Sequence, residues 1–140
     1  MKIFDVQKAD YFRAGDNSLL CELMHPNRTS EILPIGYSIA HATIPVKEKT
    51  LPHRLKTSSE VYVILSGQGQ MHIGEETADL SPGQAVCIPP GVVQWIEQTG
   101  SEPLSILAIV EPAWREEDEE CYHENDDPIF SHEEIKGRSD

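Results

Sequence analysis

The stretch LPHRLKTSSEVYVILSG (residues 51–67) contains the clearest strand of the chain together with two side chains that can do chemistry. His53 precedes Glu60, and Glu60 opens the β-prone run of residues 61–65. Side chains alternate along a strand, so Glu60, Tyr62 and Ile64 share one face, and the opposite face is apolar as well. A strand of this kind is covered on both sides, and a carboxylate buried there needs a polar partner. We therefore expect Glu60 to lie inside the protein.

Short strands of similar character fill the chain up to residue 110. Gly, Pro and Ser separate them, a pattern that predicts one all-β domain, a sandwich or barrel, with no helix in its body. A chain of 140 residues is long enough to bury a core without disulfides or a structural metal. The expected strands cover residues 2–6, 19–24, 36–44, 50–55, 60–65, 70–73, 77–80, 85–88, 92–98 and 104–110.

The segment after residue 65 contains two glycines and is interpreted as a four-residue hairpin loop, residues 66–69. A hairpin of this length pairs Ile64 with Met71, so that Met71 joins the face that carries Glu60. His72, the next residue, then points outward.

The net charge of −13 is concentrated near the C-terminus. Residues 1–110 hold twelve Asp and Glu against eight Lys and Arg, whereas residues 111–140 hold twelve against three. An acidic surface without a basic stripe excludes nucleic acid as a partner and disfavours anionic membranes. We expect a barrel over residues 1–112, followed by an acidic tail, 113–140, that is too charged to bury and is ordered in part at most. A short helix is expected after Ser131.

The first residues lack the apolar segment of a signal peptide, and no run approaches the roughly 20 apolar residues of a membrane span. The three cysteines are widely spaced and form no C-x-x-C pair, which argues against a disulfide framework. These features predict a cytoplasmic protein with reduced thiols.

Two motifs occur in order along the chain, H-x-L-x4-E-x6-G starting at His53 and G-x5-P-x-G-x2-Q starting at Gly83. Their order and spacing resemble the two motifs of the cupin superfamily. The resemblance implies a double-stranded β-helix, which is a jelly-roll-like barrel, and a homodimer. It also implies a metal ion held inside the barrel by two histidines, a glutamate and a further histidine.

The chain departs from that ligand set at two of its four positions. In the resemblance, His53 and Glu60 are ligands, whereas Leu55 replaces the second histidine and Gln94 the third. His53, Glu60 and Gln94 with waters form an oxygen-rich set that suits Mg²⁺, Mn²⁺, or loosely held Zn²⁺ or Fe²⁺. The alternative is that His53 and Glu60 form an ordinary buried hydrogen-bonded pair without metal.

A third metal-binding histidine is available only if the strand alternation differs from the one assigned. His41 shares a strand face with Ile39 and Thr43, and it reaches the pocket only if that face is the inner one. His72 is expected on the outside.

Two functions follow from these residues. In the first, a metal ion, or His53 and Glu60 without one, moves protons on a carbonyl or sugar-like small molecule in isomerase, epimerase or lyase chemistry. In the second, the barrel binds a small molecule without transforming it. The expected lining of the pocket in either case is Leu55, Tyr62, Ile64, Met71 and His41. A third possibility is that the acidic tail contacts a basic partner.

Overall fold

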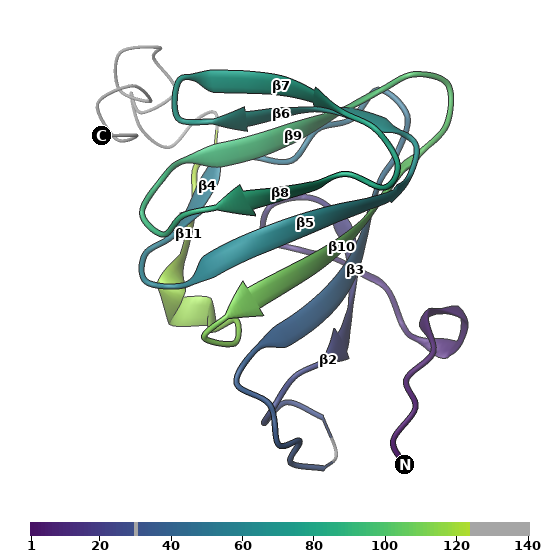
Figure 1. The fold of residues 1–140 in the computed structure, drawn as a ribbon, viewed down its shortest axis with the longest axis vertical. Helices are drawn as coiled ribbons and strands as arrows, with labels where there is room; N and C mark the ends of the chain where they lie inside the picture. Colours follow the sequence, from purple (N-terminus) through teal and green to yellow (C-terminus); the bar gives the residue numbers. More distant parts are fainter. Residues whose placement is uncertain (30, 124–140) are drawn as a thin grey trace.

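Two antiparallel sheets face each other in the computed structural model, which describes residues 1–29 and 31–123 (Figure 1). The six-stranded sheet has the order β1 (Phe12–Arg13), β2 (Leu19–Met24), β3 (Ser38–Ile44), β10 (Leu104–Glu111), β5 (Ser59–Ser66) and β8 (Ala85–Ile88). The five-stranded sheet has the order β11 (Glu119–Cys121), β4 (His53–Leu55), β9 (Gln94–Thr99), β6 (Gln68–Ile73) and β7 (Glu76–Leu80). The all-β prediction is confirmed.

Helical structure in the described residues is restricted to two single 3-10 turns, η1 (Val6–Lys8) and η2 (Glu116–Asp118). Neither these turns nor any other part of the described chain provides a helix long and apolar enough to cross a membrane.

Nine of the ten expected strands form close to their predicted bounds, and the exception is residues 2–6. This segment contains no strand, and Ile3 in its middle is 80% exposed. Figure 1 shows the N-terminal segment, in purple, running away from the barrel. A β-prone sequence forms a strand only where a neighbouring strand can pair with it, so local propensity gave the wrong prediction here.

The alternation predicted for β5 is confirmed. Glu60, Tyr62 and Ile64 are buried, whereas Val61 and Val63 on the opposite face are half-buried. The inward side chains of β5 join one apolar cluster with residues from both sheets: Ile44, Met71, Leu80, Ile88, Ile96, Leu104, Ile106 and Ala108.

The predicted hairpin between β5 and β6 is wrong, because the two strands belong to different sheets. β5 pairs with β10 and β8, and β6 pairs with β7 and β9, so Ile64 and Met71 are not cross-strand partners. Gly67, between the two strands, has a φ of +81° and lies so close to Pro103 that a Cβ would collide with the Pro103 carbonyl oxygen. The chain therefore changes sheets at a residue that only glycine can occupy without strain.

The predicted acidic tail is part of the barrel as far as Cys121. β11 pairs with β4, and Asp118 just before it is 3% exposed. The Asp118 carboxylate accepts hydrogen bonds from the Thr57 backbone N–H at 2.9 Å, the Thr57 hydroxyl at 2.7 Å and the Ser58 backbone N–H at 3.1 Å. Burial alone would raise the pKa of Asp118, but these hydrogen bonds lower it below its ordinary value.

The expectation that this segment is too charged to bury is therefore wrong for Asp118, because backbone and hydroxyl donors replace its water. Tyr122, also within the predicted tail, is 9% exposed. The remainder of the predicted tail, residues 124–140 with the helix expected after Ser131, lies outside the described residues.

The change of sheet at Gly67 gives a test with a matched control. Gly83 has a similar φ of +89°, but a Cβ there would meet nothing within 4 Å. We expect Gly83→Ala to cost about 1 to 2 kcal/mol, the cost of a left-handed residue, and Gly67→Ala to cost more because of the added collision with Pro103. Urea denaturation of the two variants measures the difference, and equal losses of stability would contradict the close approach at Gly67.

Candidate functional site

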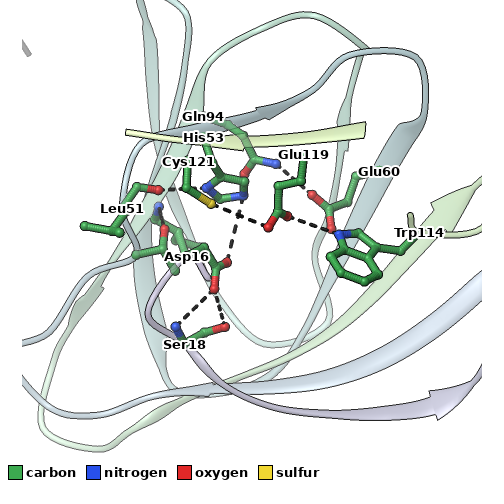
Figure 2. Close-up of polar contacts among 11 residues, drawn as sticks. Asp16, Ser18, Leu51, His53, Glu60, Gln94, Trp114, Glu119 and Cys121 are labelled. Atoms are coloured by element: carbon green, nitrogen blue, oxygen red, sulfur yellow. Dashed lines mark hydrogen bonds and ion pairs between the residues drawn. The ribbon is translucent and has the colours of Figure 1, made fainter. Parts of the chain in front are cut away.

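A cavity of about 170 Å³ lies between the two sheets. One wall comes from the inward faces of β3 and β10, where Ala40, Ala42 and Ala108 leave room because their side chains end at Cβ. The cavity is reached from four separate segments of the chain by Asp16, His53, Glu60 and Glu119, and Figure 2 shows these four together. Glu22 and Arg28 also line it.

His53 extends from β4 and is 2% exposed. Its Nδ1 lies 2.7 Å from the Leu51 carbonyl oxygen and donates a hydrogen bond to it, so Nε2 is the nitrogen that faces Asp16, with 3.9 Å between Nε2 and Oδ2. Burial alone would lower the pKa of His53, but the negative charges of Asp16, Glu60 and Glu119 raise it above its ordinary value. The site therefore favours an imidazolium whose Nε2–H is directed at Asp16.

Glu60 enters the cavity from β5 in the opposite sheet. The Gln94 side-chain nitrogen, from β9, donates a hydrogen bond of 2.7 Å to Glu60 Oε1. Burial raises the pKa of Glu60 from 4.5 to about 7, although His53 and the Gln94 hydrogen bond act in the opposite direction. At neutral pH, Glu60 is therefore present both with and without its proton, as an acid–base catalyst requires.

Asp16 and Glu119 are site residues that sequence reasoning missed. Asp16 lies in the turn between β1 and β2, where its Oδ1 accepts from the Ser18 backbone N–H at 3.1 Å and the Ser18 hydroxyl at 2.7 Å. Glu119 belongs to β11, and its two carboxylate oxygens accept from Trp114 Nε1 at 3.2 Å and from the Cys121 thiol at 3.5 Å. In the sequence, Asp16 is recognisable only as a turn residue, and Glu119 is one of several acidic residues in a row. Neither is therefore distinguished as a site residue.

Of the pocket residues expected from the sequence, Tyr62 lines the cavity together with His53 and Glu60. Ile64 and Met71 are inward-facing but belong to the apolar cluster that fills the rest of the barrel. Leu55 is 5% exposed and is absent from the cavity wall.

The two histidines considered as further ligands both lie on outer faces. His41 points away from the cavity because β3 turns Ala40 and Ala42 inward, and its ring nitrogens contact the Tyr11 hydroxyl at 2.7 Å and the Ser105 hydroxyl at 2.6 Å. His72 stacks on Trp95, with 4.4 Å between the ring centroids. Neither imidazole reaches His53 or Glu60, so the strand alternation assigned from the sequence is correct.

The residues expected to hold a metal ion do not fit one in this arrangement. Gln94 directs its amide N–H groups, not its oxygen, at Glu60. Leu55 brings no donor atom, and within residues 1–29 and 31–123 no three His, Cys, Asp or Glu side chains are grouped so that they could hold a metal ion. The buried Gln94 Oε1 has no hydrogen-bond partner in the part of the chain that is described. A donor on a bound molecule would satisfy it.

Comparison with known proteins gives matches along most of the chain. A sequence model of the cupin-domain family matches residues 40–110. The uncharacterized protein MJ1618 of Methanocaldococcus jannaschii is 39% identical over 122 residues, covering 86% of this chain and 95% of that protein.

Two solved structures are similar in fold. The Streptomyces nucleoside dehydratase Pac13, solved with uridine, gives a TM-score of 0.67 at 17% identity and covers 88% of this chain and 92% of its own. A predicted oxalate decarboxylase from Thermotoga maritima gives a TM-score of 0.68 at 18% identity, covering 79% and 98%. At these identities the likeness shows the barrel and nothing about the chemistry.

The raised pKa of Glu60 predicts how stability changes with pH. The folded protein keeps the Glu60 proton up to about pH 7, whereas the unfolded chain releases it near 4.5. The stability that Glu60 contributes is therefore fully present below pH 4.5 and is lost as the pH rises through 7. Glu60→Gln cannot ionise, so between pH 4.5 and 8 its free energy of unfolding should increase by about 3 kcal/mol relative to that of the unsubstituted protein.

Chemical denaturation at a series of pH values measures this difference. Glu76→Gln, a change at an exposed carboxylate on β7, is the matched control and should run parallel to the unsubstituted protein. If the free energy of unfolding of Glu60→Gln also runs parallel to that of the unsubstituted protein across the pH series, burial does not raise the pKa of Glu60.

Proposed function

The chain belongs to the cupin family, and we propose that it is an enzyme that moves protons on a small, sugar-like carbonyl compound bound in its cavity. The observation that carries the proposal is the pairing of a carboxyl of pKa about 7, Glu60, with an imidazole of raised pKa, His53, in one cavity. A base and an acid that are both available at neutral pH are what enolisation requires.

The proposed reaction is an isomerisation or epimerisation. The Glu60 carboxylate removes a proton from the carbon next to the carbonyl, and the electrons of that C–H bond form the carbon–carbon double bond of an enediol. The carbonyl oxygen takes the proton of His53 Nε2 at the same time. In isomerisation, Glu60 then returns its proton to the neighbouring carbon, and the hydroxyl on the carbon that lost its proton gives a proton back to His53. In epimerisation, the enediol first turns over in the cavity, so that Glu60 protonates the opposite face of the original carbon while the hydroxyl of the former carbonyl gives its proton back to His53. Both residues end as they began, and no electrons are exchanged with a cofactor.

The walls of the cavity support this chemistry. Ala40, Ala42, Ile96 and Ile106 surround the polar groups with apolar surface. Exclusion of water strengthens the electrostatic interactions between the reacting groups and maintains the high pKa of Glu60. A nucleoside dehydratase with the same fold, solved with uridine, also makes sugar-containing compounds reasonable first candidates.

The alternative is a binding protein that uses the same cavity without chemistry. The apolar walls favour it, because they can hold a ligand whether or not a proton moves. The two functions differ in whether a bound compound exchanges hydrogen with solvent.

Deuterium exchange tests the proposal directly. The protein is incubated in D2O with a panel of aldoses, ketoses and uridine, and incorporation at the carbon next to the carbonyl is followed by NMR. We expect incorporation with at least one sugar, and a loss of 100-fold or more in Glu60→Gln and in His53→Gln. The rate should rise with pH as Glu60 loses its proton near 7.

His72→Gln is the matched control, because it removes an imidazole that lies on the outer face against Trp95. Its exchange rate should equal that of the unsubstituted protein. Binding of a sugar without exchange supports the binding function, and exchange that survives Glu60→Gln overturns the assignment of the base.

A second experiment tests whether a divalent metal ion is bound at His53, Glu60 and Gln94. Elemental analysis of protein purified without chelator or added metal, and of His53→Ala and Gln94→Ala, measures bound Mn, Fe, Zn and Mg. Stoichiometric metal that both substitutions remove would place a metal ion at His53, Glu60 and Gln94 and overturn the metal-free route. Metal that neither substitution affects would leave that route standing.

We also infer that the protein is a homodimer that associates through the outer face of the six-stranded sheet. On this face, two rows of cross-strand neighbours run from β3 through β10 and β5 to β8, and neither row contains a charged side chain. Because the chain carries a net charge of −13, two copies associate best where charge is absent. The rows are Ile39, Ile109, Val61 and Cys87, and His41, Leu107, Val63 and Ala85.

Light scattering after gel filtration measures the oligomeric state. We expect a dimer for the unsubstituted protein and a monomer for Val63→Lys, which places a charge at the centre of the face. Ala78→Lys, on the exposed edge strand β7, should remain dimeric. A monomer without substitution would overturn the inference.

A further inference from the structure

Gln94 lies behind the two proposed catalytic side chains. It is 1% exposed and is absent from the wall of the cavity, so it acts on a bound molecule only through another residue. Its backbone is fixed from both sides, because it pairs with His53 in β4 and with Ile73 in β6. Residues directly opposite each other in an antiparallel pair have Cβ atoms about 5 Å apart, and Figure 2 shows the Gln94 amide beside the His53 ring. The ladder therefore sets where His53 lies relative to Gln94.

The side chain of Gln94 reaches across to the other sheet. Its amide nitrogen donates a hydrogen bond of 2.7 Å to Glu60 Oε1, and Tyr62, two residues further along β5, is a second hydrogen-bond neighbour of the same side chain. Glu60 and Tyr62 share the inward face of β5, so the amide meets two adjacent groups of that face. Gln94 thus contacts both members of the proposed acid–base pair, His53 through the ladder and Glu60 through the amide.

An N–H directed at Oε1 makes the two oxygens of Glu60 different. A carboxylate oxygen that accepts a hydrogen bond from a buried donor is less ready to take a proton, because the donor already stabilises its negative charge. Glu60 lines the cavity, and with Oε1 occupied by Gln94 the oxygen left for a bound molecule is Oε2.

We propose that Gln94 is the positioning residue of the acid–base pair: its amide holds Glu60 Oε1, so that Oε2 is the atom that removes and returns the substrate proton, and its pairing with His53 fixes the acid relative to this base. The assignment rests on the proposed function for the reaction and deepens it. The same hydrogen bond lowers the pKa of Glu60 against the larger effect of burial, so Gln94 widens the range of pH in which the base is ionised.

Gln94→Met removes the amide and keeps the length of the side chain. Without the N–H, the pKa of Glu60 should rise above its value of about 7. The titration midpoint should move up by about one pH unit, because a hydrogen bond to a charged group is lost. Carbon-13 NMR of the side-chain carboxyl measures the midpoint, and Glu60→Gln identifies the signal. The pH profile of deuterium exchange should move by the same amount, and the limiting rate at high pH should fall about tenfold because Oε2 is no longer held in place.

Gln98→Met is the matched control. Gln98 belongs to the same strand, is 7% exposed and also loses its hydrogen bonds on substitution, but its partners are the Lys47 backbone N–H and three carbonyl oxygens within residues 99–102. It should leave the Glu60 titration and the pH profile of exchange unchanged. A midpoint that moves equally in both variants would mean a general effect on the structure and would overturn the proposal.

A second variant and a measurement on the unsubstituted protein cover the case in which Gln94→Met does not fold. Gln94→Asn keeps the amide but shortens the side chain by one methylene group, so it should raise the Glu60 midpoint as well. In the unsubstituted protein, the side-chain 1H–15N signals of Gln94 should shift with the midpoint of Glu60, near pH 7. Constant Gln94 signals, or an unchanged Glu60 titration in a folded variant, would contradict the role of Gln94.

The result is separable from that of the proposed function. If no sugar exchanges hydrogen, the proposed enzyme is contradicted, whereas the NMR titrations still decide whether Gln94 controls Glu60. If exchange depends on Glu60 but keeps the same pH profile in Gln94→Met, the enzyme is supported and the positioning role is refuted.

Discussion

The hydrogen bond from Gln94 to Glu60 joins the two sheets across the interior of the barrel. Glu60 belongs to β5 of the six-stranded sheet and Gln94 to β9 of the five-stranded sheet, and both side chains are at least nine-tenths buried. A carboxyl group in this position costs free energy unless it keeps a proton or a donor. Gln94 provides one donor and the raised pKa provides the proton, so the barrel tolerates a group that can still react.

This chain differs from the ligand pattern of its family at Leu55 and Gln94, and both residues belong to the five-stranded sheet that faces Glu60. Where an imidazole is expected, Gln94 supplies an amide that directs its nitrogen at Glu60, and Leu55 supplies only apolar surface. Glu60 thereby receives a hydrogen bond from Gln94. Its pKa remains high because burial disfavours the charged form by more than the Gln94 hydrogen bond and His53 stabilise it.

Sequence reasoning succeeded where the information is local and periodic. The alternation in β5 placed Glu60 and Tyr62 inside, and motif spacing identified the family. It failed where the outcome depends on contacts between distant segments. Nothing near Gly67 in the sequence shows that Pro103 lies against it, and nothing near Asp16 shows that Glu119 is its neighbour. Charge misled for the same reason, since Asp118 is buried by donors from residues about sixty positions earlier.

The position of β11 has a consequence for biosynthesis. Asp118 anchors this strand beside β4, and Glu119 completes the cavity from it. The strands that form the core, up to β10, leave the ribosome before β11 does, so a nascent barrel can collapse while one wall of its cavity is still missing. Until residue 121 has emerged and paired with His53 in the β4 ladder, the site is open to water on that side. The wall of the cavity that contains Glu119 is therefore complete only after residue 121 has been synthesised.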